Sequence, residues 1–271
     1  KTQKRYVIDG LQRISTIVRF FREDSWILAK SADVDPRISG RKISEIKENE
    51  PMLWEKLENL MIPVTVLRCD YQKKNHMEYL FQIFHRLNAG GNKLFNQEIR
   101  NCIFQGTLNS LLKRMARTAE WMKFTETDES KIIKARFSHE ERILRFFAFY
   151  FNQKQYSGRL SVFLNDFMEN KRNLPEKEIQ LYAELLQQTI EIANKMTYSI
   201  EIRNNRNLLE GILLGIAHNR EHLSAFSVSD LQKRLQDLLQ TKPYSEDTRE
   251  GLAHTEKVNE RINTAVRIFG A

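Results

Sequence analysis

The segment Tyr6-Val-Ile-Asp-Gly-Leu-Gln-Arg-Ile-Ser-Thr16 decides the fold that the sequence predicts. Residues 6–8 are typical of the end of a buried strand. Asp9 and Gly10 form a strong turn signal, because glycine accepts a positive φ and aspartate can bond its own backbone. Apolar side chains then recur at helical spacing, at Leu11, Ile14, Ile17, Val18 and Phe21. The segment therefore predicts a strand, a tight turn and the first turns of a helix.

The first turn of this helix carries side chains that suit an anion. Its backbone N–H groups lack helical partners and stand at the positive end of the helix dipole. Gln12 and Arg13 add amide and guanidinium donors, and Ser15 and Thr16 add hydroxyls. Such donors fit phosphate most naturally. An ordinary strand–helix turn with a solvated arginine explains the same residues, and the sequence leaves both interpretations open.

Composition indicates a globular protein with enough apolar material for a sizeable core. Of the 271 residues, 41% are apolar and 29% are charged. No apolar run approaches the ~20 residues of a membrane span, no secretory signal opens the chain, and Cys69 and Cys102 lack metal-ligand spacing. We therefore expect a cytoplasmic protein with reduced thiols and no membrane partner. The net charge of +8 is compatible with nucleotide or nucleic-acid partners.

Two parts of different character follow one another along the chain. Residues 62–70 are rich in β-branched side chains and predict a strand, whereas His76–Leu87 has the apolar stripe of an amphipathic helix. After Gly106 every segment has helical spacing. We therefore expect an α+β domain over residues 1–106 and an all-helical domain over residues 107–271. Because the first domain starts abruptly, we also expect that residues upstream of it are missing from this sequence.

Two separated motifs occur in register within the first part. One is Asp9-Gly-Leu-Gln-Arg13, followed by Ser15 and Thr16. The other is Phe84-His-Arg-Leu-Asn-Ala-Gly-Gly91, followed by Leu94 and Gln97-Glu-Ile-Arg-Asn101. The pair resembles the N-terminal domain family of GmrSD restriction endonucleases, a ParB/sulfiredoxin-like family with an Asp-Gly-Gln-Gln-Arg motif. The resemblance implies a small mixed sheet with helices, in a single-domain member that lacks the HNH nuclease domain.

The resemblance also implies an activity and partners. Family members bind a nucleoside triphosphate with Mg²⁺, and some hydrolyse it to the diphosphate and phosphate; whether GTP, ATP or CTP is used here is left open. The implied partners are the nucleotide, double-stranded DNA and a separate nuclease subunit, in a prokaryotic restriction or anti-phage defence system. The competing interpretation is a non-catalytic DNA-binding or regulatory subunit on the same ParB-like scaffold.

Departures from the family pattern put hydrolysis in doubt. Leu11 stands where the family usually has its first glutamine, and the upstream Pro-x-x-Gln-Arg-type segment that helps to build the same pocket is absent from this sequence. No Gly-x-x-x-x-Gly-Lys-Ser/Thr motif occurs, which excludes a P-loop NTPase. The sequence also offers no candidate nuclease centre.

Each residue of the first motif has a functional and a structural interpretation. Asp9 and Gln12 are the candidate catalytic residues, which would place Mg²⁺ or a water; the alternatives are a carboxylate that caps the turn and a solvated amide. Arg13 is expected to neutralise phosphate, for which its planar fork is suited. Gly10, Ser15 and Thr16 complete the expected nucleotide-binding set in this turn.

The second motif is expected to support the same site. Asn88 and Gly90 would shape a loop against the nucleotide, although loop geometry alone explains them. Glu98, Arg100 and Asn101 would form a buried polar network that ties this loop to the core. No metal site made of protein ligands is expected, because the six histidines are scattered without metal-ligand spacing.

Overall fold

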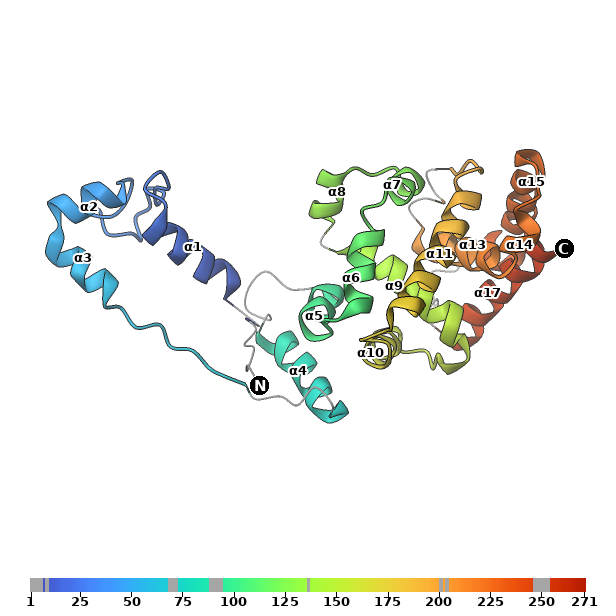
Figure 1. Cartoon of the computed structure of the whole chain (residues 1–271), viewed down its shortest axis with the longest axis horizontal. Coiled ribbons are helices and arrows are strands. Elements are labelled where there is room, and N and C mark those ends of the chain that lie inside the picture. Colours follow the sequence, from blue (N-terminus) through green and yellow to red (C-terminus); the bar gives the residue numbers. More distant parts are fainter. Residues whose placement is uncertain are drawn as a thin grey trace. The chain divides into compact units, whose positions relative to one another are not determined.

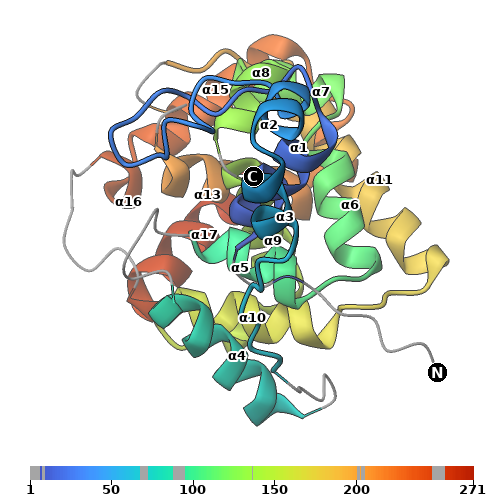
Figure 2. The same cartoon turned by 90° about the vertical axis from the view of Figure 1, so that its left-hand side faces the viewer.

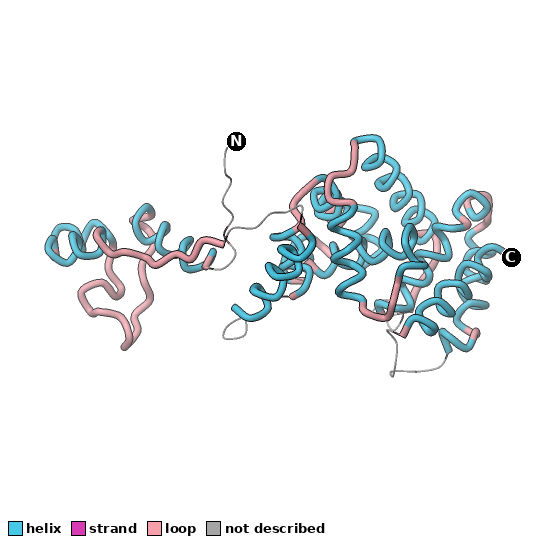
Figure 3. The backbone as a smooth tube through the Cα atoms, turned by 90° about the horizontal axis from the view of Figure 1, so that it is seen from below, coloured by secondary structure: helices cyan, strands magenta, loops and turns pink. Residues whose placement is uncertain are grey.

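Helices form the regular structure of this chain wherever the computed structural model describes it, which is over residues 7, 10–67, 73–87, 95–135, 137–199, 202, 205–245 and 254–271. These residues belong to two units, Lys1–Asn92 and Lys93–Ala271, each of which is described by itself. The backbone in Figure 3 alternates between helix and loop throughout its described part.

The first unit is built on a small aromatic core. Its helices are α1 (Leu11–Arg22), α2 (Ile43–Asn49), α3 (Pro51–Glu58) and α4 (Lys74–Leu87) (Figure 1). Phe20 and Phe21, near the end of α1, lie with their ring centroids 6.3 Å and 5.3 Å from that of Trp54 in α3. Ile14 and Val18, earlier in α1, have exposed side chains. The core therefore anchors the C-terminal end of α1 and leaves its N-terminal half open.

The strand expected over residues 62–70 is wrong, and so is the α+β fold class with a ParB/sulfiredoxin-like mixed sheet. Residues 61–67 have no regular secondary structure, and Ile62, Val64 and Val66 are 56%, 76% and 60% exposed. Alternating β-branched residues form a strand only where a neighbouring strand binds their backbone and a core covers one face. Within the described ranges no such neighbour exists. Residues 68–70, and residues 6 and 8 of the other expected strand, lie outside these ranges.

The second unit is a chain of packed helices, as the spacing after Gly106 predicts. Its elements are α5 (Asn96–Ile103), α6 (Thr107–Met115), α7 (Ala119–Thr125), α8 (Glu129–Lys134), α9 (Ser138–Asn152), the short 3₁₀ helix η2 (Gln153–Gln155), α10 (Leu160–Asn170), α11 (Glu176–Ala193), α13 (Arg206–His218), α14 (Arg220–Leu223), α15 (Val228–Leu239), α16 (Lys242–Ser245) and α17 (Thr255–Gly270). The units divide after Asn92, so α5 belongs to the second one. The domain boundary expected at residue 106 stays a prediction, because compact structural units need not coincide with the evolutionary domains of a protein.

Helices α9 and α13 lie at the centre of the second unit. α9 packs against α5, α6, α10 and α13, and α13 also packs against α11 and α17. α6 and α11 lie side by side next to this pair (Figure 2). Ile143, Leu144 and Phe147 of α9 and Ile212 and Leu214 of α13 are completely buried. Burial of each such side chain stabilises the fold by about 1.5–3 kcal/mol, so these two helices carry the core.

Gly211 allows α13 to lie close to α16. A Cβ built on Gly211 would stand 1.9 Å from the hydroxyl oxygen of Tyr244. That hydroxyl donates to the carbonyl oxygen of Arg261 in α17, at 3.2 Å, which holds the tyrosine in place. Packing, rather than backbone conformation, therefore requires the glycine.

We expect Gly211→Ala to lower the free energy of unfolding by about 2 kcal/mol, because overpacking a close contact costs roughly 1–3 kcal/mol. Urea denaturation of the full chain measures this change. In a Tyr244→Phe background the hydroxyl is absent, and Gly211→Ala should then lower the free energy of unfolding by clearly less. Equal costs in the two backgrounds would contradict this account of the contact.

Candidate functional site

The turn that opens α1 is the candidate phosphate site. Gly10 is the N-cap residue of α1, and its φ of 91° lies in the left-handed region that glycine enters without strain. The N–H of Ile14 donates to the carbonyl oxygen of Gly10 at 2.8 Å, so the helix starts at the turn that the sequence predicts. Asp9 lies outside the described residues, and its role stays a prediction.

The guanidinium of Arg13 turns back toward the start of its own helix. A Cβ built on Gly10 would stand 3.5 Å from Arg13 Nη2 and 3.7 Å from Arg13 Nε. The first turn of α1 contains no acidic residue. A cation at the positive end of a helix dipole raises the local potential further. The backbone N–H groups and the guanidinium described at this end of α1 therefore favour an anion.

The other predicted residues of the site are placed only in part. Ser15 and Thr16 lie in α1 and are exposed. Gln12 lies in the first turn of α1, but its side chain is not among the described parts of the structure, and Asn88 and Gly90 lie outside the described residues altogether. The structure thus brings Arg13 to Gly10, whereas the roles of the remaining residues stay predictions.

The donors described at the start of α1 suit phosphate oxygens better than a bare metal ion, since they are N–H, guanidinium and hydroxyl groups. Mg²⁺ at this position would have to be held by the phosphates together with a carboxylate, for which Asp9 is the candidate. Among the residues that the structure describes, no group of three or more His, Cys, Asp or Glu side chains could hold a metal.

Arg100 of the second motif is buried where α5 meets α9 and α10. Its guanidinium donates to Asn165 Oδ1 at 2.8 Å, to Glu141 Oε2 at 3.1 Å and to Gln97 Oε1 at 3.2 Å. Burial lowers the pKa of Arg100, and the nearby Glu141 carboxylate partly offsets this by favouring the charged form. These contacts join three helices of the second unit through a single side chain.

Asn101 and Glu98 occupy two further positions on α5. Asn101 Oδ1 accepts from Gln97 Nε2 at 3.2 Å, and the Asn101 carbonyl accepts from Asn109 Nδ2 at the same distance. Glu98 Oε2 accepts from the backbone N–H of Phe95 at 2.8 Å, at the start of the helix. Asn101 thus connects α5 to Asn109 of α6. Glu98 provides a hydrogen-bond acceptor for a backbone N–H group at the start of α5.

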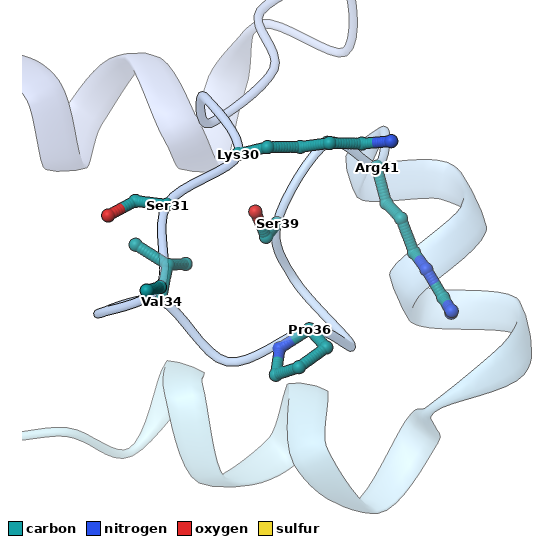
Figure 4. A pocket seen from close by; sticks show the side chains of 8 residues that line it. Lys30, Ser31, Val34, Pro36, Ser39 and Arg41 are labelled. Carbon is teal, nitrogen blue, oxygen red and sulfur yellow. The ribbon is translucent and has the colours of Figure 1, made fainter.

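A hollow in the loop between α1 and α2 was not predicted from the sequence. It is lined by Lys30, Ser31, Ala32, Val34, Pro36, Ser39, Gly40 and Arg41. Figure 4 shows the Lys30 side chain along its rim and the Arg41 guanidinium directed away from it. The N–H of Gly40 donates to the Leu28 carbonyl oxygen at 2.8 Å, which folds the loop back on itself. Because its charged groups do not converge, we assign no function to this hollow.

Comparison with known proteins supports the resemblance seen in the two motifs. Residues 1–105 match the family model described as the GmrSD restriction endonuclease, N-terminal domain, so the resemblance is confirmed for this part of the chain. The match indicates a role in a restriction or defence system. No curated protein and no solved structure matches the chain. The matched segment extends past Asn92 and includes α5 of the second unit.

Every helix within the described residues is too short or too polar to cross a membrane.

Arg100→Gln should lower the free energy of unfolding by about 3–5 kcal/mol, because the change removes one partner of a buried ion pair and leaves the Glu141 carboxylate without its counterion. Chemical denaturation monitored by far-UV circular dichroism measures the loss. Arg114→Gln is the matched control: it makes the same change of charge at an exposed position of α6, where we expect a change within about 0.5 kcal/mol. Similar small changes in both variants would show that Arg100 is not a structural residue.

Proposed function

We propose that this chain, whose first 105 residues match the GmrSD N-terminal domain family, binds the phosphate groups of a nucleoside triphosphate at the start of α1. The observation that carries the proposal is the exposed guanidinium of Arg13, which lies against Gly10 at the N-terminus of α1. The guanidinium and the backbone N–H groups of the first helical turn both favour negative charge at this place.

The proposed binding uses three kinds of donor. Backbone N–H groups in the first turn of α1 would meet phosphate oxygens, and the Arg13 fork would bridge two of them. The hydroxyls of Ser15 and Thr16 are exposed on the same helix and add further donors. Because Arg13 is exposed as well, a ligand as large as a nucleotide can reach this end of the helix.

Hydrolysis is the finer part of the proposal. Mg²⁺ bound with the triphosphate supplies charge stabilisation for a transferring phosphoryl group. Asp9 is next to Gly10 in the sequence and would hold that ion or orient a water, and Gln12 would position the attacking water. Leu11 replaces the first glutamine of the family motif, so Gln12 alone remains for this task.

The proposed biological setting is a restriction or defence system in which this chain acts with other components. A separate nuclease subunit would cut the DNA, and nucleotide binding here would control it. The net charge of +8 is compatible with contact to double-stranded DNA.

A thermal-shift measurement with ATP, GTP, CTP and UTP, each with Mg²⁺, tests the binding proposal on the full chain. At about 100 times its dissociation constant, the correct nucleotide should stabilise the wild type by ~2.7 kcal/mol. Arg13→Ala should remove most of this gain, because the mutation deletes the guanidinium that faces the phosphates.

Arg22→Ala is the control for this experiment, since Arg22 lies in the last turn of the same helix and is also exposed. It should keep the full nucleotide-dependent gain. If no nucleotide stabilises the wild type, or if both variants respond as the wild type does, the proposed site at α1 fails.

Hydrolysis is tested by phosphate release from the nucleotide that binds. We expect Asp9→Asn and Gln12→Ala each to slow release by about 10²-fold or more while the thermal shift persists, because positioning a catalytic base or water contributes roughly 10²–10⁴-fold. Absence of any release by the wild type would leave a binding protein, and unchanged rates in both variants would assign hydrolysis to other residues.

A further inference from the structure

A narrow recess opens between α7, α9 and α13 in the second unit, outside the segment that matches the family. It is lined by Trp121, Phe124, Arg142, Arg145, Phe146, Arg206, Leu209, Glu210 and Leu213. Its interior has about 20 Å³ of free space, enough for about one water molecule, and the space becomes larger only where the recess opens to solvent. A ligand larger than water would therefore bind at the mouth of the recess, where Arg206 is exposed.

The local sequence explains why guanidinium groups meet here. Arg142 and Arg145 are three residues apart, so they lie on the same side of α9. Arg206 is the first residue of α13, whose start is set by Asn205: the Asn205 side chain accepts from the N–H groups of Asn207 and Leu208. Contact between α9 and α13 then brings the three arginines together.

Arg145 is neutralised within the protein. Its Nε donates to Glu210 Oε2 at 2.5 Å, and its Nη2 donates to Asn207 Oδ1 at 3.1 Å. The other oxygen of the Glu210 carboxylate lies 3.6 Å from Arg261 Nη2. Glu210 thus already serves two arginines.

Arg142 and Arg206 have no such countercharge. The Nε of Arg142 is buried without a hydrogen-bond partner, and neither guanidinium forms an ion pair with a described carboxylate. Burial lowers the pKa of Arg142, and the charges of Arg206 and Arg145 lower it further. A buried N–H without a partner is costly, so a negative group beside the half-buried Arg142 would stabilise it.

The neighbouring side chains do not supply that group. His139 is buried beside the recess, where its Nδ1 accepts from Trp121 Nε1 at 3.1 Å. Burial, followed by the charges of Arg142 and Arg206, lowers the pKa of His139 to about 4, so it is neutral at pH 7. The charged residues that line the recess are Arg142, Arg145, Arg206 and Glu210, which are three guanidiniums and one carboxylate.

We propose that the mouth of the recess binds a phosphate group between the guanidiniums of Arg142 and Arg206. Two planar forks suit the oxygens of a tetrahedral phosphate, and the apolar wall formed by Trp121 and Phe124 strengthens the attraction by excluding water. The phosphate belongs either to a nucleotide or to a nucleic-acid backbone. This site is independent of the one at α1, since it uses no residue of the first unit.

Isothermal titration of the full chain with inorganic phosphate tests the site. The Arg13→Ala variant is the starting protein, so that the α1 site does not contribute. In this background, Arg206→Gln should weaken phosphate binding about tenfold to a hundredfold, because a charged hydrogen bond is lost. Arg206 is exposed and opens α13, so its replacement should leave the fold intact.

Two further variants make the result decisive. Arg142→Gln should weaken phosphate binding as strongly as Arg206→Gln does, with circular dichroism to show that the variant is folded. Arg114→Gln removes an equal charge from the exposed surface of α6 and should leave the affinity within twofold. Equal losses in Arg114→Gln and Arg206→Gln, or no phosphate binding by the starting protein, would overturn the proposal.

Titrations with ATP and with a short DNA duplex identify the source of the phosphate. If the site serves a nucleic-acid backbone, Arg206→Gln should weaken duplex binding and reduce the slope of log affinity against log salt by about one. If it serves a nucleotide, the variant should weaken ATP binding at constant salt. Unchanged affinity for both ligands would reject a phosphate site in this recess.

Discussion

The second unit depends on the ion pairs that the buried carboxylate of Glu210 forms with two arginines. Glu210 lies on α13 and binds Arg145 of α9 and Arg261 of α17, so one buried acid connects three helices. Buried charge is costly unless it is paired, and here the paired groups lie on three different helices. Glu210 is paired with these two arginines, and no described carboxylate forms an ion pair with Arg142. The same packing that stabilises the core therefore produces the positive recess beside it.

A comparable division of roles is found within α1. Phe20 and Phe21 attach the C-terminal end of this helix to Trp54, and the N-terminal end carries Gly10 and Arg13. The anchored end holds the backbone, whereas the open end presents its N–H groups and a guanidinium. A helix with one end packed and the other exposed can thus hold a ligand without a large enclosing pocket.

Local signals in the sequence were sufficient to predict the start of α1. Asp-Gly before a helical apolar pattern predicts a turn with positive φ and a helix after it, and both depend on neighbours in the chain. The strand at residues 62–70 failed for the opposite reason. Its β-branched pattern describes how the segment would sit in a sheet, but a strand needs a partner, which the local sequence does not specify.

The second motif identified Arg100 but could not predict which side chains surround it. Arg100 was selected because the family motif contains it, and only the structure places Asn165 and Glu141 around it, from helices far along the chain. No pattern singled out the recess at Arg142 and Arg206. Its residues are separated by more than sixty positions, and a single arginine on a helix indicates a solvated side chain.

By itself, the sequence determined the helical character of the second unit, the turn that opens α1 and the family of residues 1–105. These follow from spacing and from motifs that are read along the chain. Only the tertiary structure decided which charges are neutralised, because burial and pairing depend on which helices pack together. The two arginines that lack a countercharge are a consequence of that packing, and no property of the residues next to them in the sequence reveals it.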